Sequence, residues 1–129
     1  MENKNIMIVE DDLEVGRMLE RAFRFGGYEV DLFHNGKSVL DYLKKSKKHP
    51  HAIIMDVIMP EMSGIELLKN IKKEPGLEKI PIMVLTNSFL KEDAEQFLNL
   101  GADLYLVKIQ HKPIDIVDKI NNLIKINNK

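Results

Sequence analysis

The stretch "IIMDVIMPEMSG", residues 53–64, places one carboxylate, Asp56, inside an apolar run that continues to a proline and a glycine. Aspartate is disfavoured in strands, and a buried carboxylate without a partner is costly. The residues before Asp56 are continuously apolar, as in a strand covered on both faces of a parallel sheet. We therefore expect this strand to carry Asp56 to the edge of the sheet, where a cation compensates its charge.

Four other apolar runs resemble this one, and segments of helical period separate them. The expected strands are residues 5–9, 28–33, 52–56, 81–86 and 103–108. The expected helices, each with apolar residues at one-face spacing, are 13–25, 36–46, 64–73, 91–100 and 114–126. This alternation predicts an α/β fold of the (βα)5 type, a doubly wound parallel sheet with helices on both faces.

Length and composition indicate one ordinary domain over residues 1–129. Of the 129 residues, 44% are apolar and 30% are charged, and the net charge of −1 gives no case for direct nucleic-acid binding. There is no cysteine, which excludes disulfides, thiolate catalysis and zinc–thiolate sites. No apolar run approaches the roughly 20 residues of a membrane span. With no signal-peptide pattern at the N-terminus, we expect a cytoplasmic protein that does not enter the membrane.

Polar residues stand where the expected strands end. Glu10 and Asp11 follow the first strand, Asp56 ends the third, Thr86 the fourth and Lys108 the fifth. Each has an ordinary structural explanation, since acids favour helix starts and lysines are usually solvated. The carboxyl ends of parallel strands, however, share one edge of the sheet, where ligands bind.

Taken together, these residues indicate phosphoryl chemistry. Three close carboxylates cannot all stay ionised without a cation, and Mg²⁺ prefers such hard oxygen ligands. A lysine and a hydroxyl beside the metal suit a phosphoryl group. A carboxylate there can act as the nucleophile and form an acyl phosphate, while the cations offset the transferred charge.

The chain resembles the receiver domain of two-component response regulators over about residues 4–126. Four motifs carry the resemblance, in the family's order: "IMIVEDD" (6–12), "IIMDVIMPEMSG" (53–64), "VLTN" (84–87) and "GADLYLVK" (101–108). Any one is a weak pattern, but the set is specific. The resemblance implies the CheY-like, flavodoxin-like form of the fold, with strand order 2-1-3-4-5.

By this resemblance, Asp56 is the phosphoacceptor. Glu10 and Asp11 would hold Mg²⁺ together with Asp56 and the backbone carbonyl of Ile58. Asp12 would lie outside the metal shell, and its position before a helix also suits an N-cap.

The resemblance also implies a switch and two kinds of partner. Thr86 and Lys108 would bind the phosphoryl group, and Tyr105 would change rotamer with Thr86. The donor would be a sensor histidine kinase or a histidine phosphotransfer protein. The face formed by residues 91–100, 103–108 and 114–126 would control an unknown downstream protein, and a phosphorylation-linked dimer stays open. Such a receiver promotes its own phosphorylation and dephosphorylation without being an enzyme in the usual sense.

Two departures from the family pattern bear on the site. Ile109 stands where many receivers have a proline after the lysine, so we expect a trans peptide there and expect Pro113 to start the last helix. Ile58 stands where many receivers have a polar residue that orients an attacking water. We expect slow self-dephosphorylation, with Ser88 sharing the tuning.

Other functions fit less well. A flavin binder of this fold needs a phosphate-cradling loop after the first strand, where "EDDLE" (10–14) would repel phosphate. A P-loop nucleotidase needs GxxxxGK[ST], which is absent from the sequence. A phosphatase with an aspartate nucleophile usually has a second aspartate two residues on, where Ile58 stands. The remaining alternative is a receiver-like interaction module that acts regardless of phosphorylation.

Overall fold

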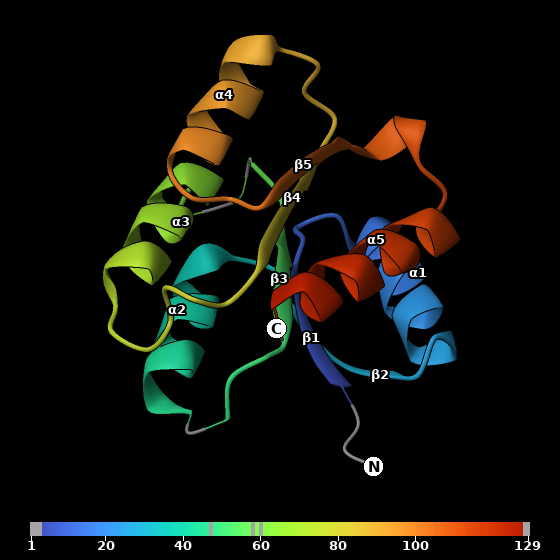
Figure 1. The fold of residues 1–129 in the computed structure, drawn as a ribbon, viewed down its shortest axis with the longest axis horizontal. Helices are drawn as coiled ribbons and strands as arrows, with labels where there is room; N and C mark the ends of the chain where they lie inside the picture. The colour runs from blue at the N-terminus through green and yellow to red at the C-terminus, as the bar shows by residue number, and fades with distance from the viewer. Residues whose placement is uncertain (1–3, 47, 58, 60, 128–129) are drawn as a thin grey trace.

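A five-stranded parallel sheet in the order β2-β1-β3-β4-β5 forms the centre of the computed structural model (Figure 1), which describes residues 4–46, 48–57, 59 and 61–127. The strands are β1 (Lys4–Val9), β2 (Tyr28–Phe33), β3 (Ala52–Met55), β4 (Ile82–Thr86) and β5 (Leu104–Val107). Every neighbouring pair is parallel. The predicted fold class and strand order are therefore confirmed.

Five α-helices cover the two faces of this sheet. They are α1 (Leu13–Phe25), α2 (Gly36–Lys45), α3 (Gly64–Lys73), α4 (Lys91–Asn99) and α5 (Pro113–Asn127). Helices α2, α3 and α4 lie on one side of the sheet, and α1 and α5 lie on the other (Figure 1). In the part of the chain that the structure describes, no helix is both long and apolar enough to span a membrane.

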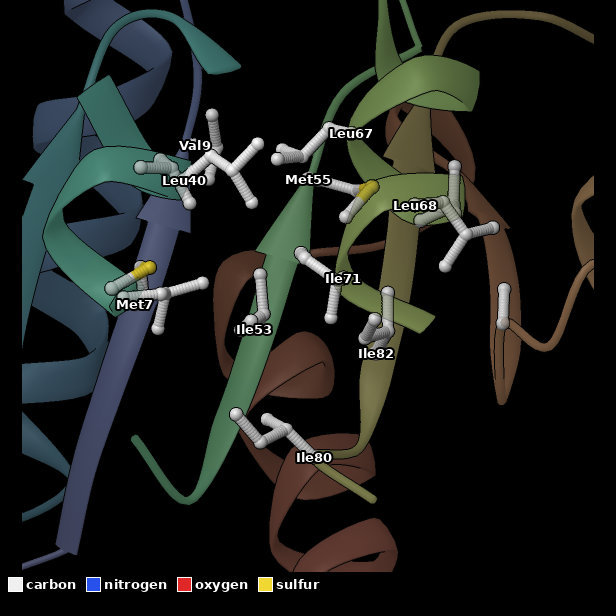
Figure 2. Packing of buried hydrophobic residues seen from close by; sticks show 14 of the residues in the cluster. Met7, Val9, Leu40, Ile53, Met55, Leu67, Leu68, Ile71, Ile80 and Ile82 are labelled. Atoms are coloured by element: carbon white, nitrogen blue, oxygen red, sulfur yellow. The ribbon is translucent and has the colours of Figure 1, made fainter. Parts of the chain in front are cut away.

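The two-sided cover explains why the central strands β1, β3 and β4 are nearly continuously apolar and lack polar alternation. In β1, Met7 and Val9 belong to the core beneath α2, α3 and α4, whereas Ile6 and Ile8 belong to the core beneath α1 and α5. Figure 2 shows the first of these cores, where Met7 and Val9 lie beside apolar side chains from α2, α3 and the neighbouring strands. These four residues of β1 are at most 1% exposed, so an unpaired charge on either face of the strand would be costly.

Local signals in the sequence set the helix starts. Asp12 caps α1, its carboxylate accepting hydrogen bonds from the backbone N–H groups of Glu14 and Val15. Pro113 is the first residue of α5, where its missing N–H costs nothing. Both expectations are confirmed, and the described part of the chain has no cis peptide bond.

Two strand ends differ from the prediction in a way that matters for the site. The third strand ends at Met55, so Asp56 lies just beyond it, and the fifth ends at Val107. Lys108 instead begins a single 3₁₀ turn, Lys108–Gln110, with its carbonyl accepting from the N–H of His111. The apolar pattern continues past both strand ends, and so it did not show where pairing stops.

Candidate functional site

Backbone hydrogen bonds hold two acidic residues at the carboxyl edge of the sheet. The N–H of Glu10 donates to the Phe33 carbonyl at 2.9 Å, and that of Asp56 donates to the Val9 carbonyl at 3.1 Å. Both residues continue the path of a central strand although they lie outside it. Glu10 is 2% exposed and Asp56 is 8% exposed, so their charges need partners within the protein.

Lys108 is the cation that meets both of these acids. Its Nζ lies 2.7 Å from Glu10 Oε1 and 3.0 Å from Asp56 Oδ2. The second oxygen of Asp56, Oδ1, accepts from the N–H of Val57 at 2.6 Å. Each carboxylate oxygen of Asp56 therefore has a donor, and the carboxylate is held in one orientation.

A third acid completes a cluster of hard oxygen donors. Glu10, Asp11 and Asp56 each offer a carboxylate oxygen, and these oxygens lie within 4.8 Å of one another. One lysine offsets only part of the formal charge of these three carboxylates. Oxygen donors with excess negative charge are the set that Mg²⁺ prefers, so the residues fit the expected metal. The fourth expected ligand, the carbonyl of Ile58, lies outside the described residues.

The burial and crowding of these groups perturb their protonation. Burial raises the pKa of Glu10 to about 7, Asp56 adds to the rise, and the hydrogen bond from Lys108 offsets part of it. Burial lowers the pKa of Lys108, but its hydrogen bonds to Glu10 and Asp56 outweigh burial and leave that pKa above its ordinary value. The lysine therefore stays charged at neutral pH, while Glu10 takes up a proton more readily than a solvated glutamate does.

A cleft of about 480 Å³ opens over this cluster. Its lining combines expected residues with others, and it consists of Asp11, Asp56, Val57, Thr86, Asn87, Ser88, Asp93 and Lys108. Thr86 ends β4 and is buried, and its Oγ1 lies 3.5 Å from the N–H nitrogen of Ser88. The fold thus brings Asp11, Asp56, Thr86, Ser88 and Lys108 to a single cleft.

Tyr105 lies near the cleft but outside its lining. Its hydroxyl donates to the backbone carbonyl of Ser88 at 3.3 Å. The centroid of its ring lies 6.0 Å from the centroid of the Phe97 ring. Its side chain therefore joins β5 to the loop between β4 and α4. This contact argues against a tyrosine that merely covers the sheet surface.

Gly64 explains how α3 starts directly behind Asp56. Its N–H donates to the Val57 carbonyl at 2.8 Å. A Cβ at this position would lie 2.5 Å from the Asp56 carbonyl oxygen and 3.0 Å from the Val57 Cα, and both are backbone atoms. Glycine is therefore required here for a close approach of two backbone segments.

Asp93 is the residue of this cleft that sequence reasoning missed. It lies in the first turn of α4, and its Oδ2 accepts from the Ser88 hydroxyl at 2.5 Å. An acid in a first helical turn is common, because it suits the helix dipole. Only the path of the preceding loop brings this one to the cleft.

The sequence model of the response regulator receiver domain matches residues 6–121. The chain belongs to this family. As a receiver domain of the two-component type, it has the general role of a phosphorylation receiver. The acids, the threonine and the lysine described above lie together at one edge of the sheet.

The curated relatives of this receiver domain are longer proteins than this chain. It is 35% identical over 103 residues to the response regulator MprA of Mycobacterium avium, a match that covers 80% of this chain and 43% of MprA. It thus spans less than half the length of the curated relatives that it matches first.

Solved structures agree on the fold. The CheY-like receiver domain protein of Methanospirillum hungatei has a TM-score of 0.88 at 26% identity, covering 98% of each chain. The receiver domain of the sensor histidine kinase PA1611 of Pseudomonas aeruginosa, which has a magnesium ion coordinated in its active site cleft, has a TM-score of 0.85 at 26% identity. That match covers 96% of this chain and 99% of the PA1611 domain.

Proposed function

We propose that Asp56 accepts a phosphoryl group from a phosphohistidine on a sensor histidine kinase or a histidine phosphotransfer protein. An Asp56 carboxylate oxygen attacks phosphorus, the P–N bond of the donor breaks, and the electron pair stays with the imidazole. The observation that carries this proposal is the bridge from Lys108 Nζ to both Glu10 and Asp56, of which Lys108 and Asp56 line the cleft. That ammonium group lies where charge would develop on the transferred group.

Glu10, Asp11 and Asp56 would hold a Mg²⁺ ion during the transfer, with the backbone carbonyl of Ile58 as a further expected ligand. The donor set supports this assignment, because three carboxylate oxygens lie within 4.8 Å of one another and a single lysine opposes them. When bound, the ion would neutralise charge on the carboxylates and on the phosphoryl oxygens.

The output of phosphorylation would be a population shift in the face formed by α4, β5 and α5. Thr86 would donate its hydroxyl to a phosphoryl oxygen and weaken its contact with the N–H of Ser88. The Tyr105 hydroxyl donates a hydrogen bond to the carbonyl of Ser88, so a movement of the loop between β4 and α4 would displace a side chain of β5 directly. The changed face would act on a downstream protein or on a further domain, and self-dephosphorylation, tuned by Ile58 and Ser88, would end the signal.

Phosphorylation by a small donor tests the proposal. Incubation with acetyl phosphate and Mg²⁺ should add the mass of one phosphoryl group, and Asp56→Ala should abolish the gain. Asp41→Ala is the matched control, because Asp41 is an exposed acid on α2.

The same experiment addresses the alternative of an interaction module that acts regardless of phosphorylation. A chain that gains no mass under these conditions, in the presence or absence of Mg²⁺, would favour that alternative. A gain of mass in Asp56→Ala would show that the acceptor is a different residue.

A further inference from the structure

We infer that Asp93 is a positioning residue for the water that removes the phosphoryl group from Asp56. The inference rests on the proposed function, because it assumes that Asp56 is phosphorylated. It starts from one hydrogen bond: the Ser88 hydroxyl donates to Asp93 Oδ2 at 2.5 Å. Both residues line the cleft that contains Asp56.

A serine hydroxyl has a single hydrogen, so the bond to Asp93 decides how Ser88 can interact. A charged acceptor holds that hydrogen strongly, and Ser88 Oγ then offers lone pairs to the cleft. One lone pair faces the N–H of Leu90, at 3.3 Å. The other lone pair can accept a hydrogen bond from a water molecule in the cleft. It cannot bond to a phosphoryl oxygen, because both carry negative charge and neither has a hydrogen to donate. Asp93 therefore makes Ser88 an acceptor for water and prevents it from donating to the phosphoryl group.

The loop is fixed from a second side, so this arrangement is ordered. Tyr105 donates to the carbonyl of Ser88, and Ser88 N–H approaches Thr86 Oγ1. Before phosphorylation, Ser88 is thus held at its carbonyl, its N–H and its hydroxyl. The bond from its hydroxyl to Asp93 does not involve Thr86, so it would remain when phosphorylation weakens the contact between Thr86 and the Ser88 N–H. A water that donates to Ser88 Oγ keeps its own lone pair free to attack phosphorus.

The reaction balances without another reagent. The water oxygen bonds to phosphorus and keeps one hydrogen, so that hydrogen phosphate forms. The P–O bond to Asp56 breaks, and its electron pair returns to the carboxylate, which Lys108 stabilises and which a bound Mg²⁺ would also stabilise. The second proton of the water leaves to the solvent.

The structural alternative is that the pair only closes the start of α4. Leu90, the residue before the helix, has no side-chain oxygen with which to cap it, and Ser88 Oγ accepts from the Leu90 N–H instead. Under this alternative, loss of Asp93 would disturb the loop and slow phosphoryl gain as well as loss. Under our inference, the loss step slows and the gain does not.

The test compares Asp93→Asn with Glu92→Gln, which removes the same charge from an exposed residue in the same turn. Each protein is phosphorylated with acetyl phosphate and Mg²⁺, the donor is removed, and the decay of the phosphorylated species is followed by intact mass. We expect decay about fivefold slower in Asp93→Asn, because a neutral amide replaces the charged acceptor that holds the Ser88 hydrogen, with an unchanged rate of gain. Glu92→Gln should decay like the parent.

A double-mutant cycle with Ser88→Ala separates positioning from a general charge effect. Ser88→Ala should slow the decay, and Asp93→Asn should add little in that background. An equal effect of Asp93→Asn with and without Ser88, or an unchanged decay, would overturn the inference while the proposed function stood. Slower gain together with a lower melting temperature in Asp93→Asn would assign Asp93 a structural role instead. Failure of the parent to gain a phosphoryl group would overturn the proposed function itself.

Discussion

Lys108 Nζ lies 3.0 Å from Asp56 Oδ2, although the two residues are 52 positions apart in the chain. The same ammonium group lies 2.7 Å from Glu10, so a single cation joins the acids that follow two neighbouring strands. Its own side chain is only 14% exposed. The charge balance of the site therefore depends on how the turn after β5 is placed.

Replacing Lys108 by methionine should destabilise the metal-free protein by about 1–3 kcal/mol, because two buried carboxylates lose a charged donor. Lys91→Met is the control. Lys91 and Glu95 are exposed, and Lys91 Nζ lies 3.7 Å from Glu95 Oε1, so loss of this ion pair should lower the free energy of unfolding by less than about 0.5 kcal/mol. Urea unfolding in EDTA measures both variants, and similar small effects would contradict the role of Lys108. Acetyl phosphate should also label Lys108→Met more slowly than the parent.

Gly64→Ala should destabilise the protein by about 1–3 kcal/mol, because the new methyl group meets backbone that cannot move away cheaply. It should also slow phosphorylation, since the atom it strikes is the carbonyl oxygen of Asp56. Gly16→Ala is matched to it: this added Cβ meets only the side-chain tip of Leu32, at 3.2 Å, within a helix. Thermal melting and intact mass should show a loss in the first variant and almost none in the second.

Tyr28 should give the folded state a sensitivity to alkaline pH. Burial raises the pKa of Tyr28 above its ordinary value of 10.0, and its hydroxyl donates to Asn121. The folded state thus holds the phenolic proton more tightly than the unfolded state, and the stability from this group is lost as pH rises through the folded pKa.

Tyr28→Phe should be less stable than the parent by about 1 kcal/mol at about pH 8, because the hydrogen bond is lost. That difference should shrink as the pH rises above 10.0, the ordinary pKa of tyrosine, and through the raised pKa of Tyr28 in the folded state. Tyr42→Phe controls for the substitution, since Tyr42 is 38% exposed. A Tyr28→Phe deficit that stays constant with pH would contradict the assignment.

Ile58→Asn should shorten the life of the phosphorylated state, because an amide can orient the attacking water and an isoleucine cannot. This prediction comes from the sequence, since Ile58 lies outside the described residues. We expect decay about fivefold faster, the effect of one added hydrogen bond, measured by intact mass after removal of the donor. Ile58→Val keeps the apolar character and should decay like the parent. Equal half-lives of the phosphorylated state in the parent, Ile58→Asn and Ile58→Val would contradict the prediction.

Much of the fold could be predicted from the sequence, because strands that are buried on both faces appear as continuous apolar runs. Strand β1 is apolar and buried from Ile6 to Val9, and Asp56 stands out only against such a background. The edge residues Glu10 and Asp11 were likewise visible, since each follows an apolar strand directly.

The relation between Ser88 and Asp93 could not be read in this way. Residues five apart have no fixed relation when a loop and a helix start lie between them, and an acid in a first turn has an ordinary explanation. The contact of Tyr105 with the Ser88 carbonyl depends on the packing of β5 against β4, which no local pattern contains. The end of β5 was also placed one residue late, because Lys108 follows an apolar run without a break.

The bridge from Lys108 to Glu10 spans 98 of the 129 positions of the chain. During synthesis, the acids after β1 and β3 emerge before the turn that carries the lysine, and a domain generally folds as a unit. A chain cut before Lys108 would have Glu10 and Asp56 without the ammonium group that bonds to both. Under the proposed function, the site would therefore become competent for phosphoryl transfer only after β5 and the turn that follows it have been synthesised.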